Sequence, residues 1–582
     1  MLPVNDHALA VKRERDHNSV HRSLGAATFG LAAVLLAGCA TMMPPPQTAP
    51  VIAQDPSLLT QGALREAIEA RKAALKPAAA KIDAVIAFYE IRDFRPAWSL
   101  EAQQDMAAQV RARLTQASAQ GLRSGEYRIP GKSRLAPGRE AAEFEIAFSD
   151  ALLRYAHDVH NGRLRPTDIY EDVELPLSNF DPVVDLVKAL RAGAVPKFLA
   201  DLPPAHPEYA RLVQALARYR AIEEKGGWPA VPGGNEIKLD GTDARLNVLV
   251  QRLAAEDPML AAIAAPSASD IRDSVKRFQA RNGLGEDGRV GGATFTALNV
   301  TAAARAGAIA VNMERWRWLP ANFEHRYVAV NVPDQSVEFV RDGRTVLHSP
   351  VVVGRANSPT PITRSEIVAV VVNPPWNIPG DIAARDLLPQ LKRNPNFLAA
   401  KHMVITDGPP NDPYGKKIDW RKVVPAEFPY AIKQLPGPQT ALGAVMLDSP
   451  NDFDVYLHDT PNKKLFDLTQ REISNGCIRV QQIFPLASLA LTDDASEGMA
   501  MLNKTVKARD TKRIALDAPL PVYFLYWTAM AKADGEVDFR PDRYDRDAPL
   551  IAALVKGEPA VKLNKRMGEG ADEPMMEGDI SP

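Results

Sequence analysis

The chain has 582 residues, 46% of them apolar, and its 70 Lys and Arg against 71 Asp and Glu give a formal net charge of −1. This balance does not indicate a nucleic-acid-binding or strongly acidic protein, and the length predicts three or four domains of about 150 residues each. The apolar fraction is ordinary for globular proteins, so a stable core does not require disulfides.

The N-terminal segment predicts export from the cytoplasm. Basic residues precede a short apolar run, 24–36, which ends in Leu-Ala-Gly-Cys39. This order of basic and apolar residues is typical of a secretory signal peptide, and the apolar run is too short for a confident membrane span. It resembles a bacterial lipoprotein signal, which implies a signal peptide at 1–38, lipid on Cys39 and a periplasmic protein anchored to a membrane. Ala40 is compatible with the outer membrane. An ordinary short membrane anchor is the alternative.

The next segments differ in composition. Residues 39–60 are rich in Pro, Ala and Gln, which predicts a semi-rigid extended tether. Residues 61–240 show helical periodicity; for example, Leu212, Leu216 and Tyr219 fall on one helical face. We therefore expect a helical domain after the tether.

A compact helical module is expected at 241–300. Asp270 is a candidate N-cap for a helix whose apolar face includes Val275 and Phe278. The turn Asp287-Gly288 separates this helix from the next one. The run resembles a three-helix peptidoglycan-binding module, and a helical spacer that binds nothing is the alternative.

From 312 to 510 the pattern predicts short strands, typical of a β-sandwich or barrel-like domain. A partly helical insertion at about 380–425 is expected to act as a lid. Residues 511–560 predict a C-terminal extension with a buried strand, and 561–582 a disordered acidic tail. The fold class is therefore multidomain α+β.

The candidate chemistry lies between 454 and 480. His458 ends a β-prone run, and Cys477 follows Gly476 in a chain with only two cysteines. A thiol with a free pKa of about 8.5 becomes a good nucleophile when an imidazole takes its proton. If Cys39 carries lipid, Cys477 is the remaining thiol and no intramolecular disulfide forms. We expect no metal and no cofactor, since no zinc-type spacing occurs.

The series His458, Ser474, Asn475, Gly476 and Cys477, followed by Ile478-Arg479, resembles the signature of L,D-transpeptidases with a YkuD-type catalytic domain. The commonest form of this motif has a second His where Asn475 stands. The resemblance implies a mostly-β catalytic domain, and 61–240 resembles the helical scaffold domain of the long periplasmic members.

The resemblance also implies residue roles. Cys477 is the nucleophile, His458 the base, Asp459 orients the imidazole through its backbone carbonyl, and N–H groups around Gly476 and Cys477 form the oxyanion hole. Further candidates for contact with substrate are Arg479, Tyr456, Trp376, Ser474 and Asn475. Arg479 is equally compatible with a structural ion pair, and the two aromatics with core packing.

The implied activity is formation of 3→3 cross-links between peptidoglycan stem peptides, a tetrapeptide donor and a neighbouring acceptor, with release of D-alanine. Two alternatives remain: a non-catalytic lipoprotein that tethers the membrane to peptidoglycan, and a carboxypeptidase or exchange enzyme that uses the same thioester. No nucleic-acid partner is expected.

Overall fold

The computed structural model describes residues 55–76, 83–131, 135–176, 178 and 180–556. The expected signal peptide, Cys39 and the acidic tail lie outside these residues. The described residues all belong to one compact unit. In the described residues, no single helix is long and apolar enough to cross a membrane. Helices α13, Gly292–Leu298, and α14, Ala302–Arg317, meet that test only as a pair bent by 82°.

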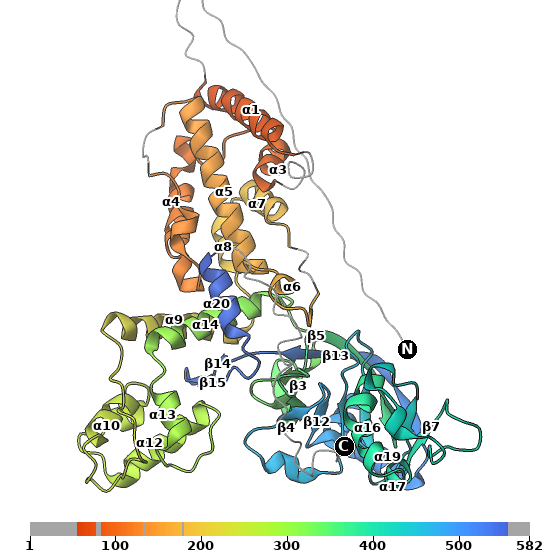
Figure 1. Ribbon diagram of the computed structural model, residues 1–582. Helices are drawn as coiled ribbons and strands as arrows, with labels where there is room; N and C mark the ends of the chain where they lie inside the picture. Colours follow the sequence, from red (N-terminus) through yellow and green to blue (C-terminus); the bar gives the residue numbers. More distant parts are fainter. Residues whose placement is uncertain (1–54, 77–82, 132–134, 177, 179, 557–582) are drawn as a thin grey trace, which may run out of the picture. The chain divides into compact units, whose positions relative to one another are not determined.

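The N-terminal helices pack around their own core (Figure 1). Their bounds are α1 Pro56–Ala74, α3 Ala84–Ile91, α4 Gln104–Thr115, α5 Arg139–Asn161, α7 Pro182–Arg191 and α8 Val195–Asp201. The short helix α6, Pro166–Ile169, instead buries Ile169 in the core of the catalytic domain. Helix α1 begins inside the expected tether, because the Asp55 carboxylate accepts the Ser57 N–H and Pro56 takes the first helical position.

Helix α9, Pro207–Glu224, was expected within the helical domain, but it packs elsewhere. Its apolar face, which includes the expected Leu212, Leu216 and Tyr219, forms a core with helix α14, Ala302–Arg317, and with strands of the catalytic domain. The period of a helix predicts which face is buried but not the partner that covers it.

The small module consists of α10 Leu246–Ala254, the single turn α11 Pro258–Ala261, α12 Ala268–Arg281 and α13 Gly292–Leu298. Its core also takes in Val231 and Ile237, so it begins before residue 241. The expected N-cap was wrong: Ser267 caps α12, and Asp270 is the third helical residue, whose carboxylate accepts the Ser267 N–H in a capping box.

In the described part of the chain, ten strands form one sheet in the order β1-β5-β13-β2-β3-β4-β12-β10-β9, with β11 beside β4. Because β9 also pairs with β5, the sheet closes on itself. The bounds are β1 Val173–Glu174, β2 Arg326–Asn331, β3 Ser336–Arg341, β4 Arg344–Gly354, β5 Ile362–Val372, β9 Val445–Asp448, β10 Leu457–His458, β11 Glu472–Ser474, β12 Ile478–Val480 and β13 Lys512–Leu525.

This arrangement confirms the multidomain α+β class and a β-rich catalytic domain. It also shows that the expected domain end at 510 is too early, since β13 lies between β5 and β2 in the closed sheet. The remaining elements after the catalytic stretch are α18 Ile483–Leu491, α19 Ala495–Ala508, the hairpin of β14 Ala529–Ala531 and β15 Val537–Phe539, and α20 Asp547–Lys556.

The insertion is a small subdomain that is partly helical, as expected, and that also contains a sheet. Strands β6 Trp376–Ile378, β7 Met403–Ile405 and β8 Ile432–Gln434 form a separate sheet beside α15 Gly380–Ile382, the π-helical turn η4 Ala383–Leu387, α16 Leu388–Arg393 and α17 Phe397–Ala400. It has its own apolar core. The insertion therefore spans 376–434, beyond the expected 380–425.

Candidate active site

The pairing of β10 with β12 brings the two halves of the motif together. The strands are parallel, with Leu457 opposite Ile478 and His458 opposite Arg479. Since side chains alternate along a strand, Tyr456, His458, Cys477 and Arg479 share one face of this pair. Leu457 and Ile478 point to the other face and are buried in the core of the closed sheet.

His458 is held in one tautomer. Its Nδ1 lies 2.6 Å from the backbone oxygen of Asp459, and because a carbonyl can only accept, Nδ1 carries the proton. The other ring nitrogen, Nε2, is left as a base. Burial, together with the nearby positive charge of Arg479, lowers the pKa of His458 to about 4. The imidazole is therefore neutral at pH 7.

The carbonyl that orients His458 is itself fixed. The Asp459 N–H donates to Val445, and its carboxylate accepts the Ala444 N–H at 2.9 Å and pairs with Lys463. Gly443 approaches so closely that a methyl group there would lie 2.4 Å from the Asp459 Cβ. Asp459 can therefore occupy this position only because residue 443 is a glycine.

Cys477 is half-buried, and its Sγ lies 3.6 Å from the backbone oxygen of Asp454. Burial raises the pKa of the thiol above its usual value, although the Tyr456 N–H and the charge of Arg479 act in the opposite direction. The resting pair is therefore a neutral thiol and a neutral imidazole, and the thiolate forms only when the proton moves.

The turn before the nucleophile is closed by internal hydrogen bonds. The Ser474 hydroxyl donates to the Cys477 oxygen at 2.6 Å and accepts the Gly476 N–H at 3.2 Å. Ser474, a candidate for contact with substrate, is thus buried, with its hydroxyl bonded within the turn. The Gly476 N–H already has a partner, which leaves the Cys477 N–H as the candidate oxyanion donor.

Thr360, which the sequence analysis missed, stabilises this turn through its side-chain hydroxyl. Its buried hydroxyl donates to the Gly476 oxygen at 2.7 Å and accepts the Gly354 N–H at 2.9 Å. Nothing near Thr360 in the sequence marks this role, because the contact joins segments more than a hundred residues apart. Gly476 has a positive φ of 110°, a backbone conformation that glycine adopts more readily than other residues.

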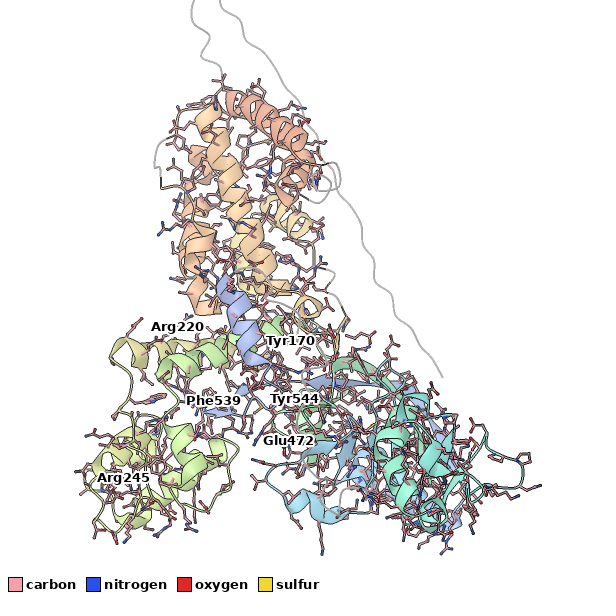
Figure 2. The ribbon with its side chains drawn as sticks, viewed as in Figure 1. Tyr170, Arg220, Arg245, Glu472, Phe539 and Tyr544 are labelled. Atoms are coloured by element: carbon pink, nitrogen blue, oxygen red, sulfur yellow. The ribbon has the colours of Figure 1, made fainter. Side chains whose placement is uncertain are left out.

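The C-terminal extension supports the same loop. The Tyr544 hydroxyl donates to the Gly354 oxygen, and Arg543 pairs with Glu472 of β11 at 2.9 Å. Figure 2 labels Tyr544 and Glu472, which lie close together in that view. The extension is therefore part of the framework of the site.

The other residues expected to contact substrate lie in different surroundings from one another. Asn475 contacts Arg355, which follows β4, and Arg385 and Asp386 of the insertion. Trp376 packs against the core of the insertion. The Tyr456 hydroxyl donates to Asp454 at 3.3 Å. Of the residues expected to contact substrate, Tyr456 and Arg479 share the face of the nucleophile.

The described residues provide neither a metal site nor a nucleophile in the cavity beside α9. Among the described residues, no cluster of three or more His, Cys, Asp or Glu side chains could hold a metal ion. A cavity of about 370 Å³ lies between α9, the small module and the β14–β15 turn, lined by residues that include Tyr219, Glu256, Arg281 and Glu536. It contains no nucleophile, and Arg281 pairs with Glu536.

Three family models match the chain. A scaffold domain covers residues 83–216, a "Putative peptidoglycan binding domain" 252–298, and an L,D-transpeptidase catalytic domain of the YkuD type 325–500. All the residues of the site from Arg355 to Arg479 lie within the last match.

A protein of Haemophilus influenzae described as "Putative L,D-transpeptidase" is 35% identical over 247 residues, which is 42% of this chain and 49% of that protein. The chain thus aligns with about half the length of this curated relative. A solved structure, "Structure of the Ldtfm-avibactam carbamoyl enzyme", matches 36% of this chain and 51% of its own at 13% identity and a TM-score of 0.18, too low to support a comparison. The catalytic, scaffold and peptidoglycan-binding domain matches, together with this relative, support assignment of the chain to the L,D-transpeptidase family.

Proposed function

We propose that the chain forms 3→3 cross-links in peptidoglycan through an acyl-enzyme on Cys477. The observation that carries this proposal is the bond from His458 Nδ1 to the Asp459 carbonyl, which leaves Nε2 unprotonated on the same face as the thiol. That arrangement is what a general base beside a nucleophile requires.

The first half-reaction makes a thioester. The Cys477 sulfur attacks the carbonyl between the third residue of a tetrapeptide stem and its terminal D-alanine, while Nε2 of His458 takes the thiol proton. The tetrahedral oxyanion is stabilised by the Cys477 N–H. When the C–N bond breaks, the imidazolium returns the proton to the leaving amine, and D-alanine departs.

The second half-reaction transfers the acyl group. The side-chain amine of the diamino acid on a neighbouring stem attacks the thioester and gives a proton to His458. The C–S bond then breaks, and the imidazolium returns this proton to the leaving thiolate of Cys477. The low pKa of His458 suits a base that stays unprotonated between steps. Water or a free D-amino acid as acceptor gives the carboxypeptidase or exchange reaction instead.

The other modules support a protein that works on the cell wall. We propose that the small helical module binds peptidoglycan and that Cys39 is lipidated after signal cleavage, which anchors the protein in the periplasm to the outer membrane. The match to a peptidoglycan-binding model supports the first point, and the Leu-Ala-Gly-Cys39 sequence the second.

The test incubates the full chain and its Cys477→Ala variant with a disaccharide-tetrapeptide and follows the intact masses of protein and muropeptide. We expect loss of D-alanine, a thioester adduct and a cross-linked dimer with the wild type alone. An adduct followed only by monomeric tripeptide identifies a carboxypeptidase. Absence of both adduct and D-alanine release, with retained binding to sacculi, contradicts the catalytic proposal and favours the tethering lipoprotein.

A further inference from the structure

A ring of polar side chains joins the catalytic turn to the insertion. Arg385 and Asp386 lie in the π-helical turn η4, and the Arg385 guanidinium binds the Asp386 carboxylate through Nε at 2.9 Å and Nη2 at 3.0 Å. The same Nη2 donates to Asn475 Oδ1 at 2.9 Å. Arg355 donates to that oxygen as well, and the Asn475 amide reaches Asp386 at 3.5 Å. Asn475 is therefore the link between the two elements.

Within the ring itself, positive charge exceeds negative charge, and the neighbouring negative charge of Asp381 also acts on Arg385. The ring contains two guanidinium groups and one carboxylate, while Asn475 is neutral. The side chains of Arg385 and Arg355 are 43% and 30% exposed, against 14% for Asp386. The cationic groups thus face solvent more than the carboxylate that holds them. Among the described residues, none is recorded as accepting a hydrogen bond from Nη1 of Arg385. An anion could take that donor without breaking the ring.

The small separation of Asn475 and Cys477 along the chain indicates which anionic group of a substrate the ring could bind. Asn475 precedes Cys477 by two residues, a span of at most about 7 Å. The Cα of Asn475 therefore lies at most two amino-acid lengths from that of Cys477, close to the point of attack. In a donor peptide, the carboxylate of the last residue stands one residue beyond the attacked carbonyl. Arginine forks bind carboxylates with two parallel hydrogen bonds.

We propose that Arg385 and Arg355, oriented by Asn475 and Asp386, bind the terminal carboxylate of the donor stem peptide. This inference rests on the proposed function, since it names the part of the donor that the same site recognises. It also gives the Asn475 departure from the commonest motif a purpose: a side-chain amide both accepts from two arginines and donates to the carboxylate that holds them. The π-helical turn presents Arg385 at this point, as such turns often do at functional sites.

The test measures binding and not turnover. The full chain with Cys477→Ala is titrated with a tetrapeptide that ends in a free carboxylate and with the same peptide ending in a carboxamide. We expect the carboxylate peptide to bind about 10- to 100-fold more tightly, as is usual for a charge-assisted pair that is partly desolvated. Adding Arg385→Gln should remove this preference, and Arg385→Lys should restore part of it by charge alone.

The matched control is Arg421→Gln, an exposed arginine of the same insertion, which should leave the preference unchanged. Equal binding of the two peptides by the parent protein overturns the proposal. So does an Arg385→Gln variant that weakens both peptides equally, because the ring would then only hold the insertion in place.

The outcome is separable from that of the proposed function. If the wild type releases no D-alanine but the parent variant still prefers the carboxylate, the reaction is wrong and the carboxylate site stands. If the wild type releases D-alanine while adding Arg385→Gln to the Cys477→Ala parent leaves the preference for the carboxylate peptide unchanged, the reaction stands and the carboxylate site is wrong.

Discussion

Replacing Gly443 with alanine should damage both stability and catalysis. The backbone of Gly443 has φ of +61°, and an added Cβ would lie 2.4 Å from the Cβ and 2.5 Å from Oδ2 of Asp459. The left-handed conformation costs about 1–2 kcal/mol for an alanine, and overpacking costs about 1–3 kcal/mol. We therefore expect a loss of about 2–5 kcal/mol in the free energy of unfolding.

The effect on catalysis follows from the contact between Asp459 and His458. Relief of the clash moves Asp459, whose carbonyl holds Nδ1 of His458 at 2.6 Å. A shift of about 1 Å in a catalytic group costs about 100-fold in rate, so acylation of Cys477 should slow by that factor.

Urea unfolding measures the first effect, and the rate of adduct formation in intact mass spectra measures the second. Gly437→Ala is the control, because Gly437 is exposed and has open space around it. If Gly443→Ala unfolds and acylates like the wild type and the control, the position of Asp459 does not depend on Gly443 and the reasoning is refuted.

Three further predictions concern stability. Because the folded pKa of His458 is about 4 and the unfolded value about 6.5, its contribution is complete above pH 6.5 and is lost as the pH falls toward 4. Urea unfolding at pH 7 and 4.5 should show a smaller acid loss in His458→Gln than in the wild type, and an equal loss would contradict this. Thr360→Val removes the hydroxyl bonded to Gly476 and should cost about 1–3 kcal/mol; an unchanged unfolding midpoint would rule out its support of the turn. Glu145→Gln should cost about 3 kcal/mol, because this buried carboxylate accepts several backbone N–H bonds, whereas the exposed Glu143→Gln should change little; equal midpoints would show that the buried bonds contribute nothing.

The centre of the candidate site can be located from local sequence for a physical reason. Leu457 and Ile478 are apolar residues whose burial fixes the register of two strands, and that register places His458 and Cys477 on the same face. The bond to Asp459 involves the next residue along the chain, so it too was within reach of local reasoning.

The surroundings of the site were not predictable in this way. Arg385 and Asp386 meet Asn475 across about ninety residues, and no local pattern specifies such a contact. Ser474 has a type suited to binding substrate, but its hydroxyl closes the turn instead. The first half of β13 was not predicted as a strand because its side chains are mostly exposed. Its pairing with β5 buries backbone groups and few side chains.

The place of β13 in the closed sheet also affects how the protein is made. This strand lies between β5 and β2, and both are synthesised more than a hundred residues earlier. Until residue 525 has emerged, β5 and β2 lack this neighbour, and unpaired strand edges are prone to association with other chains. A nascent chain interrupted before β13 would hold both halves of the catalytic motif and still lack the frame that aligns them.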